Sequence, residues 1–182
     1  MRVTSETKEA TRQAILDATR KLLVERGWEG VATRDIAAEA GVGNGTLFNY
    51  FPNKEAIVAE LMAEALAQAN DAPRKGTAEE QVYALIAGGI RRLRPYRPLI
   101  PFTLGSILTN DERLKREHLE QIERIFARTL PPMLRHLYWS LYSGILTFWV
   151  SDQSPKQVET LAFIDHSVAL FCASLNSKEG GA

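Results

Sequence analysis

The stretch from Thr33 to Pro52, TRDIAAEAGVGNGTLFNYFP, predicts two short helices joined by a tight turn. A small residue at Ala37 lets the second helix approach the first closely. Gly41 can end the first helix in a left-handed conformation at little steric cost. The second helix, about Asn44 to Phe51, is then held away from the body, where it could enter a DNA major groove. The apolar positions that would fix the angle between the two helices are Ile36, Ala40, Val42 and Leu47.

The segment GVGNGT inside this stretch also looks like a glycine loop that binds phosphate. Such loops follow a strand and continue into Gly-Lys-Ser or Gly-Lys-Thr. Here the segment follows a helical pattern, and no Gly-Lys-Ser or Gly-Lys-Thr follows it. We therefore favour the helix-turn-helix, which a further helix at about residues 7–26 precedes. A three-helix scaffold that only packs is the alternative.

Composition indicates an ordinary soluble globular protein. The chain has 182 residues, of which 45% are hydrophobic and 24% are charged, with one cysteine. One cysteine excludes an internal disulfide framework and fits a reducing compartment. The start of the chain lacks the apolar region of a signal peptide, and no apolar run nears membrane-spanning length. We expect a cytoplasmic protein without a membrane partner or cofactor.

The net charge gives no indication of nucleic-acid binding, because it is formally zero. The first 54 residues carry eight Lys and Arg against seven Asp and Glu. A DNA-binding protein with this balance must gather its positive groups on one face. Counterion release, and with it the salt dependence of binding, should then be modest.

Helical periodicity continues to the end of the chain, without strand alternation or repeats. Together the patterns predict an all-α protein of about nine helices. We assign residues 1–52 to the helix-turn-helix domain and 53–76 to a connecting helix and linker. The linker contains the polar turn DAPRKG. Residues 77–182 are assigned to a helical ligand-binding and dimerisation domain.

The last two helices are apolar on more than one face, which predicts burial against more than their own domain. We interpret this surplus as a homodimer interface in which the pair packs against its twin. A fully internal helix in a monomer is the alternative. One recognition helix is too small to bind specifically, and two-fold symmetry supplies a second half-site. The predicted interface residues are Leu141, Ile145, Phe148, Leu161, Ile164, Val168, Phe171 and Leu175.

From about Thr7 to Glu64 the sequence resembles the TetR family of bacterial transcriptional regulators. The family's hallmark runs Gly-Val-x-x-Gly-Thr-Leu-Tyr-x-His/Tyr-Phe and then x-x-Lys-Glu. Here it reads GVGNGTLFNYF from Gly41, followed by Lys54 and Glu55. The remainder resembles the family in architecture, and the run LYWSLYSGILTFWVSDQSP is similar to one branch of its C-terminal domains.

The resemblance implies a dimeric repressor that a small molecule releases from a palindromic operator. By matching position, it assigns phosphate-backbone contacts to Thr33, Tyr50 and Lys54. It assigns Arg34 to a phosphate or to a groove edge. Asn44 replaces the usual lysine and keeps an amide that can read adenine. Phe48 replaces the usual tyrosine, and it either touches a thymine methyl or is partly buried. The predicted DNA-binding residues are Thr33, Arg34, Asn44, Gly45, Thr46, Phe48, Asn49, Tyr50 and Lys54.

A pocket for the unknown effector would lie inside the helical domain of residues 77–182, which we call the rear domain. An apolar lining with a few polar tips would suit a hydrophobic effector. Each lining residue could instead be plain core. Gly88 and Gly89 indicate the close approach of a helix or of a ligand. The candidate lining residues are Ile86, Ile90, Phe102, Ile125, Phe126, Met133, Trp139 and Tyr142.

Two other function classes compete with the regulator. An enzyme is disfavoured, because the three histidines are scattered and no nucleophile or metal motif accompanies them. A helical adaptor or sensor with weakened DNA binding fits the neutral charge and the changes at Asn44 and Phe48. The sequence does not identify the effector, the operator or the regulated genes, nor does it separate a repressor from an activator.

Overall fold

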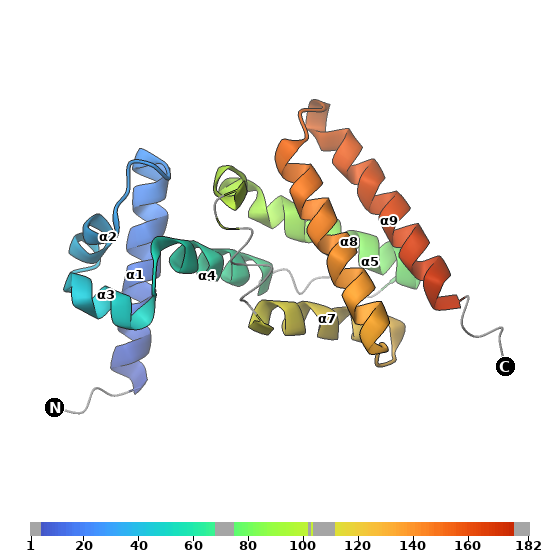
Figure 1. The fold of residues 1–182 in the computed structure, drawn as a ribbon, viewed down its shortest axis with the longest axis horizontal. Helices are drawn as coiled ribbons and strands as arrows, with labels where there is room; N and C mark the ends of the chain where they lie inside the picture. The colour runs from blue at the N-terminus through green and yellow to red at the C-terminus, as the bar shows by residue number, and fades with distance from the viewer. Residues whose placement is uncertain (1–4, 68–74, 102, 104–111, 177–182) are drawn as a thin grey trace.

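The computed structural model describes residues 5–67, 75–101, 103 and 112–176, and within these ranges the chain forms helices and turns without a strand. The expected all-α class is therefore confirmed. Eight α-helices and two short 3-10 helices lie in the described part, against about nine expected helices. Figure 1 shows the N-terminal helices gathered at one end, a connecting helix leading away from them, and the remaining helices packed together at the other end.

The front unit consists of α1 (Ser5–Arg26), α2 (Thr33–Glu39) and α3 (Asn44–Tyr50). These helices pack around their own apolar core. The apolar positions of α1 recur at helical spacing, so one side of this helix becomes buried. The core contains Ile15, Leu16, Leu22, Val31, Ile36, Ala37, Leu47 and Phe51.

Helix α4 (Lys54–Ala67) contributes side chains to the apolar cores at both ends of the molecule. Its residues Ile57 and Leu61 complete the front core, whereas Val58 and Met62 lie in the rear core. Adjacent residues on a helix point about 100° apart, so one helix can serve two cores at once. Tyr96, in the 3-10 helix η1 (Arg94–Leu99), packs against both cores.

Helix α5 (Ala78–Leu93) begins with the capping box that Thr77 and Glu80 predict. The Thr77 hydroxyl accepts a hydrogen bond from the Glu80 amide, and the Glu80 carboxylate accepts one from the Thr77 amide. Gly89 faces α4, where a Cβ atom would lie 3.1 Å from the Leu66 side chain. The close approach at this glycine is therefore helix packing, the first of the two alternatives.

The rear unit is completed by α7 (Glu112–Phe126), α8 (Pro132–Ser151) and α9 (Val158–Asn176). Helix α9 packs against both α5 and α8. Figure 1 shows α8 and α9 as a long adjacent pair joined by a short turn. The larger apolar side chains that fill the core between these helices are Val82, Ile86, Leu119, Tyr138, Tyr142, Trp149, Ile164 and Phe171.

A short 3-10 helix precedes α9, with Ser154 as its N-cap. Residues Pro155–Gln157 form the 3-10 helix η2, with positive φ angles at Lys156 and Gln157. The Asp152 carboxylate accepts hydrogen bonds from the Ser154 amide and from the amide and hydroxyl of Thr160. These bonds hold the pKa of Asp152 well below its usual range. Asp152 therefore caps the start of α9 together with Ser154, whose hydroxyl accepts a hydrogen bond from the Glu159 amide at 3.1 Å.

One segment has the length and composition of a membrane span, contrary to the expectation that none would. Residues Pro155–Leu175 have a mean hydropathy of 1.4 over the most apolar window. By composition alone, a core helix of a soluble protein passes the same test. Helix α9 buries one side in the rear core, so part of its apolar character is explained by packing within the protomer.

Candidate nucleic-acid interface

The predicted helix-turn-helix is present, with Gly41 at its turn. Gly41 has a φ of +67°, the left-handed conformation expected of it. The Val42 amide donates to the Ala37 carbonyl at 2.9 Å, which closes the end of α2. Helix α2 is capped at Ala32 rather than at Thr33, and the Asp35 carboxylate accepts the Ala32 amide at 2.9 Å. Thr33 is thus the first helical residue, at the positive end of the helix.

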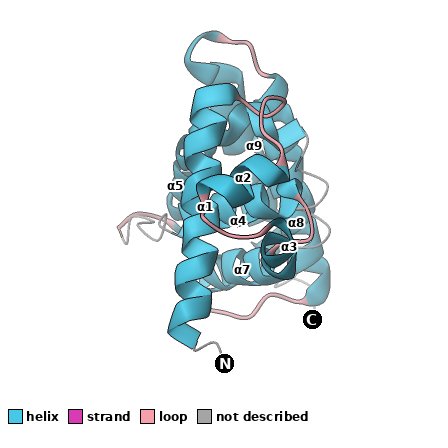
Figure 2. Cartoon of the chain, turned by 90° about the vertical axis from the view of Figure 1, so that its left-hand side faces the viewer, coloured by secondary structure: helices cyan, strands magenta, loops and turns pink. Residues whose placement is uncertain are grey.

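Helix α3 turns a polar face to solvent. Leu47 is fully buried against α1 and α2, which fixes the rotation of α3 about its own axis. Asn44, Gly45, Thr46 and Asn49 are exposed as a consequence. The Phe48 side chain is 45% exposed, so burial of this ring is at most partial. Figure 2 views this end of the molecule with α2 and α3 in front of the other helices.

The remaining predicted contacts flank α3 on both sides. Arg34 extends from α2 with 83% of its side chain exposed, beside Asp35 at 3.9 Å. Thr33 and Tyr50 are half-buried at the edges of the same unit. Sequence-predicted DNA contacts therefore gather on one end of the molecule, although whether they touch DNA stays a prediction.

Lys54 has an intramolecular role that the sequence did not indicate. Its ammonium donates hydrogen bonds to the carbonyls of Trp28 and Val31, each at 2.8 Å. The same nitrogen lies 3.9 Å from the centroid of the Trp28 ring, a cation–π distance. These contacts tie the start of α4 to the loop before α2. In this conformation the ammonium is engaged by the protein itself.

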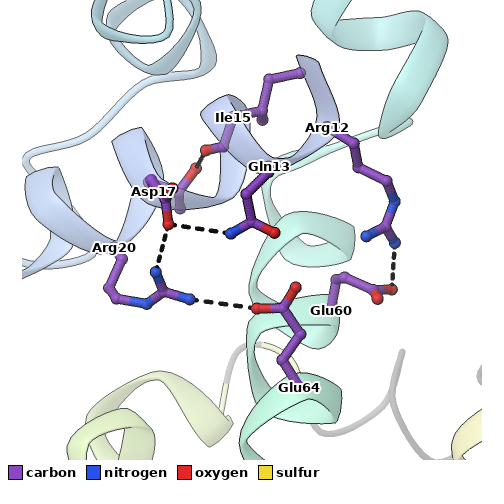
Figure 3. Close-up of polar contacts among 8 residues, drawn as sticks. Arg12, Gln13, Ile15, Asp17, Arg20, Glu60 and Glu64 are labelled. Atoms are coloured by element: carbon purple, nitrogen blue, oxygen red, sulfur yellow. Dashed lines mark hydrogen bonds and ion pairs between the residues drawn. The ribbon is translucent and has the colours of Figure 1, made fainter. Parts of the chain in front are cut away.

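Ion pairs between α1 and α4 hold the front unit on the connecting helix (Figure 3). Arg12 lies 2.8 Å from Glu60, and Arg20 lies 3.3 Å from Glu64. Arg20 also pairs with Asp17 at 2.6 Å. The side chain of Tyr96, followed by that of Asp17, raises the pKa of Arg20. One guanidinium therefore joins α1 to α4.

Residues predicted to line a pocket divide into several groups. Ile86, Ile90, Trp139 and Tyr142 are buried in the rear core, and Ile125 and Phe126 pack against it. In this conformation they act as core, the alternative reading. The prediction for Met133 is wrong, because its side chain is 70% exposed. Phe102 lies outside the described residues.

A polar cluster that was not predicted from the sequence lies inside this core. His118 is 7% exposed, and its Nε2 atom lies 2.9 Å from the Tyr138 hydroxyl. Its ring stacks on Tyr142 with the centroids 4.3 Å apart. The Tyr142 hydroxyl is buried and has no hydrogen-bond partner among the described residues, which is costly for a polar group. The spacing of His118 with Ile122 and Ile125 on α7 could have placed it on the core face.

Stability should fall on mild acidification because of His118. Burial lowers the pKa of His118 from 6.5 to about 4. Between these values the unfolded chain binds a proton that the folded chain excludes, so the free energy of unfolding decreases as pH falls. We expect a loss of about 2 kcal/mol between pH 7 and pH 5.

Urea unfolding of His118→Gln at both pH values checks this prediction, since the variant should lose that pH dependence. His166→Gln, at an exposed position on α9, is the control and should keep it. Equal pH dependence in wild type and His118→Gln would contradict the assignment.

The predicted dimer residues are placed differently from expectation. Ile145, Ile164, Val168, Phe171 and Leu175 are buried within the protomer. Their side chains already pack between α5, α8 and α9, so they cannot also form a contact surface in this conformation. Of the others, Leu161 is exposed, and Leu141 and Phe148 are half-buried.

A different set of apolar residues covers the outside of α8 and α9. We call it the α8–α9 face. Phe148 and Phe163 join the two helices through ring contact at 5.0 Å. Gly144 is exposed on α8, one helical turn before Phe148, and a Cβ atom there would meet nothing within 4 Å. Its members are Leu137, Leu141, Gly144, Phe148, Phe163 and Leu170.

The chemistry of the described residues gives no indication of a metal centre. No group of three or more His, Cys, Asp or Glu side chains in the described part could hold a metal ion. Cys172 is half-buried on α9, and burial raises the pKa of its thiol to about 11. A thiol of this kind is a poor nucleophile at neutral pH.

Two family models match the chain. Residues 15–61 match the model described as bacterial regulatory proteins, tetR family. Residues 107–179 match the model described as tetracyclin repressor-like, C-terminal domain. The first range covers the helix-turn-helix, and the second covers α7, α8 and α9.

Among curated relatives, the HTH-type transcriptional regulator PksA of Bacillus subtilis (strain 168) is 28% identical over 137 residues. The alignment covers 75% of this chain and 61% of the relative. The chain spans less than two-thirds of the length of the first relatives it matches, at 61%, 29% and 40%.

Solved structures share the fold. A TetR transcriptional regulator from Rhodococcus sp. RHA1 has a TM-score of 0.74 at 19% identity, covering 93% of this chain and 98% of the other. FadR of Thermus thermophilus, a transcriptional repressor solved in complex with lauroyl-CoA, has a TM-score of 0.63 at 20% identity. That match covers 88% of this chain and 93% of the other.

Proposed function

Because this chain belongs to the TetR family of bacterial regulatory proteins, we propose that it is a dimeric transcriptional regulator that binds double-stranded DNA. The observation that carries this proposal is the polar, solvent-facing side of α3 on a rigid helix-turn-helix. An α-helix fits the major groove of B-DNA, where each base pair presents a distinct pattern of donors and acceptors. The chain would act in the cytoplasm, where an operator is accessible.

Roles within the proposed interface follow from exposure and chemistry. The amides of Asn44 and Asn49 and the hydroxyl of Thr46 can reach base edges or flanking phosphates. Gly45 allows close approach of the backbone, and Phe48 can touch a thymine methyl. Arg34 and Thr33, at the positive end of α2, together with Tyr50, would meet the phosphate backbone.

Lys54 is proposed as an indirect contributor. Its ammonium is bonded to the carbonyls of Trp28 and Val31, so it positions α2 and α3. A phosphate contact would compete with those bonds. Within α2 and α3 the one Lys or Arg is the exposed Arg34, which supports a modest salt dependence of DNA binding.

A homodimer is proposed through the α8–α9 face. Its apolar side chains come from two adjacent helices, and the exposed Gly144 on α8 leaves room for close approach of a second copy. A symmetric pair of such faces forms a four-helix contact. Two recognition helices on one two-fold axis would then read an operator with inverted repeats.

The effector is proposed to be a small hydrophobic molecule that enters the rear domain and releases the protein from DNA. The relative from Thermus thermophilus is a repressor that was solved with lauroyl-CoA. In this chain the rear core is rich in aromatic rings and contains the unpartnered Tyr142 hydroxyl. A ligand with a hydrogen-bond acceptor near that hydroxyl would supply the partner that this buried group lacks among the described residues.

Selection from random duplexes with the purified dimer, at near-physiological salt, tests the regulator function. Enrichment of an inverted repeat is the expected result. No enrichment from folded, dimeric protein free of bound effector would reject sequence-specific binding. The adaptor alternative, which the neutral charge and the engaged Lys54 favour, would then be the better proposal.

Thr46→Ala should weaken binding to the selected operator by about tenfold without changing dimerisation. The hydroxyl is exposed on α3, so its removal deletes a polar contact and leaves the fold intact. Fluorescence anisotropy with labelled operator measures the affinity. Thr129→Ala, at an exposed threonine between α7 and α8, is the matched control. Equal affinities of the two variants would remove Thr46 from the interface.

A further inference from the structure

The outward side of α3 carries no charged side chain. The helix contains no Lys, Arg, His, Asp or Glu, and its buried residue is Leu47. Successive residues of a helix point about 100° apart, so Gly45 and Asn49 lie on the side opposite Leu47. Thr46 and Phe48 lie on the two flanks. All four are exposed, so α3 presents an uncharged and partly apolar surface to its surroundings.

The glycine on this side is not required by the fold of the protomer. Gly45 does not have the positive φ of Gly41, and a Cβ atom at Gly45 would meet no atom of the described residues within 4 Å. Glycine is also among the weakest helix formers. The missing side chain therefore leaves room for another molecule to approach the backbone of α3. Asn49, one helical turn later, would face the same molecule.

Helix α3 lacks the side chains that best distinguish G·C pairs. In the major groove, guanine presents two acceptors that Arg or Lys binds, and cytosine presents an amino group that donates to Glu or Asp. Residues 44–50 contain none of these four residue types. The one Lys or Arg of α2 and α3 is Arg34 on α2, and the first helix of this motif crosses the DNA backbone. A guanine bound by Arg34 would therefore lie outside the base pairs under α3.

A·T pairs match the side chains that α3 does carry. An Asn amide donates to N7 of adenine and accepts from its N6 amino group, which gives two hydrogen bonds to one base. Asn49 on the outward side and Asn44 at the start of the helix can each form this pair. Thymine carries a C5 methyl group that an aromatic ring contacts favourably. The Phe48 ring, 45% exposed and next to Asn49 in the sequence, offers that contact.

We propose that the base pairs under α3 in each operator half-site are A·T pairs, with the Asn49 amide bound to adenine and the Phe48 ring against a thymine methyl. This inference rests on the proposed function, in which α3 enters the major groove. The close approach that Gly45 permits brings both side chains to the base edges. Specificity at these positions then depends on amide pairing and methyl contact instead of a guanidinium.

Duplex selection with two variants tests which base Asn49 reads. Asn49→Arg should replace an adenine of each wild-type half-site by guanine, because a guanidinium binds guanine through two hydrogen bonds. Thr129→Arg adds the same charge at an exposed position between α7 and α8, and it should select the wild-type repeat. The proposal is overturned if Asn49→Arg selects the wild-type base at every position, or if the pair that it changes is G·C in the wild-type repeat.

Base analogues in the selected operator test each contact with the wild-type protein itself. Each adenine of the half-site is replaced in turn by 7-deazaadenine, which lacks the N7 acceptor. At one position the affinity should fall by about fivefold, whereas Asn49→Ala should bind the two duplexes equally. Each thymidine is likewise replaced by deoxyuridine, which lacks only the methyl group. At one position the affinity should fall by about fourfold, and Phe48→Ala should not distinguish the two duplexes.

Fluorescence anisotropy measures these affinities, and thermal melting confirms that the variants fold. Thr129→Ala is the control and should respond to both analogues as wild type does. Wild-type protein that binds every analogue duplex as tightly as the unmodified operator would overturn both contacts. An analogue effect that persists unchanged in Asn49→Ala or in Phe48→Ala would overturn the contact assigned to that residue.

The selection also separates failure of this inference from failure of the regulator function. An enriched inverted repeat with G·C pairs at the positions that α3 variants change would reject the inference and keep the regulator. No enrichment from folded, dimeric protein free of bound effector would reject the regulator function, and the inference with it.

Discussion

We expect Gly144→Leu to give a folded monomer whose affinity for the operator is at least about a hundredfold below that of wild type. A side chain at this exposed position meets no atom within 4 Å in the protomer. Leucine is also a better helix former than glycine, by up to about 1 kcal/mol, so α8 itself should not suffer. In the proposed dimer the added side chain would hold the two α8–α9 faces apart.

Sedimentation equilibrium measures the association, and anisotropy measures DNA affinity. Gly88→Leu is the matched control, because a Cβ atom there also meets nothing within 4 Å and Gly88 lies on α5. The control should remain dimeric. A dimeric Gly144→Leu protein would move the interface elsewhere, and a monomeric wild type would reject the dimer.

We expect Lys54→Met to lower the free energy of unfolding by about 2 kcal/mol, a large effect for a half-buried residue. The substitution keeps the aliphatic stem but leaves the carbonyls of Trp28 and Val31 without their charged donor. It also removes the cation from the Trp28 ring. The loop that carries α2 then loses its tie to α4, so operator affinity should fall as well.

Urea unfolding and the salt dependence of DNA binding together identify the role of Lys54. Lys21→Met is the control, because it breaks the ion pair with Glu39 at the exposed surface and should cost much less. A stable Lys54→Met protein whose salt dependence drops by about one phosphate contact would instead support the contact implied by the family resemblance.

Local chemistry made several elements predictable from the sequence. Gly41 adopts the positive φ that its position in the pattern demands, and Thr77 and Glu80 form a capping box of the Thr-x-x-Glu type at the start of α5. Each of these features depends on residues within one or two helical turns. Features that depend on neighbouring residues alone can be predicted from the sequence without knowledge of the rest of the fold.

Distant partners explain what the sequence left unpredicted in the candidate site. The Lys54 ammonium donates to carbonyls more than twenty residues earlier in the chain. His118 on α7 shares a hydrogen bond with Tyr138 on α8. A lysine near a helix start suits a phosphate as well as a carbonyl. Only the packing of α4 against the loop before α2 decides between the two in the free protein.

By itself, the sequence determined that the chain is all-helical, that a helix-turn-helix begins at Thr33, and that α8 and α9 carry more apolar surface than one core needs. The tertiary structure decided which part of that surface is buried within the protomer. Val168 and Phe171 face the protomer's own core, while Leu137 and Leu170 are exposed. Helical periodicity reports that a face is apolar, but only the placement of neighbouring helices determines which apolar face is already covered.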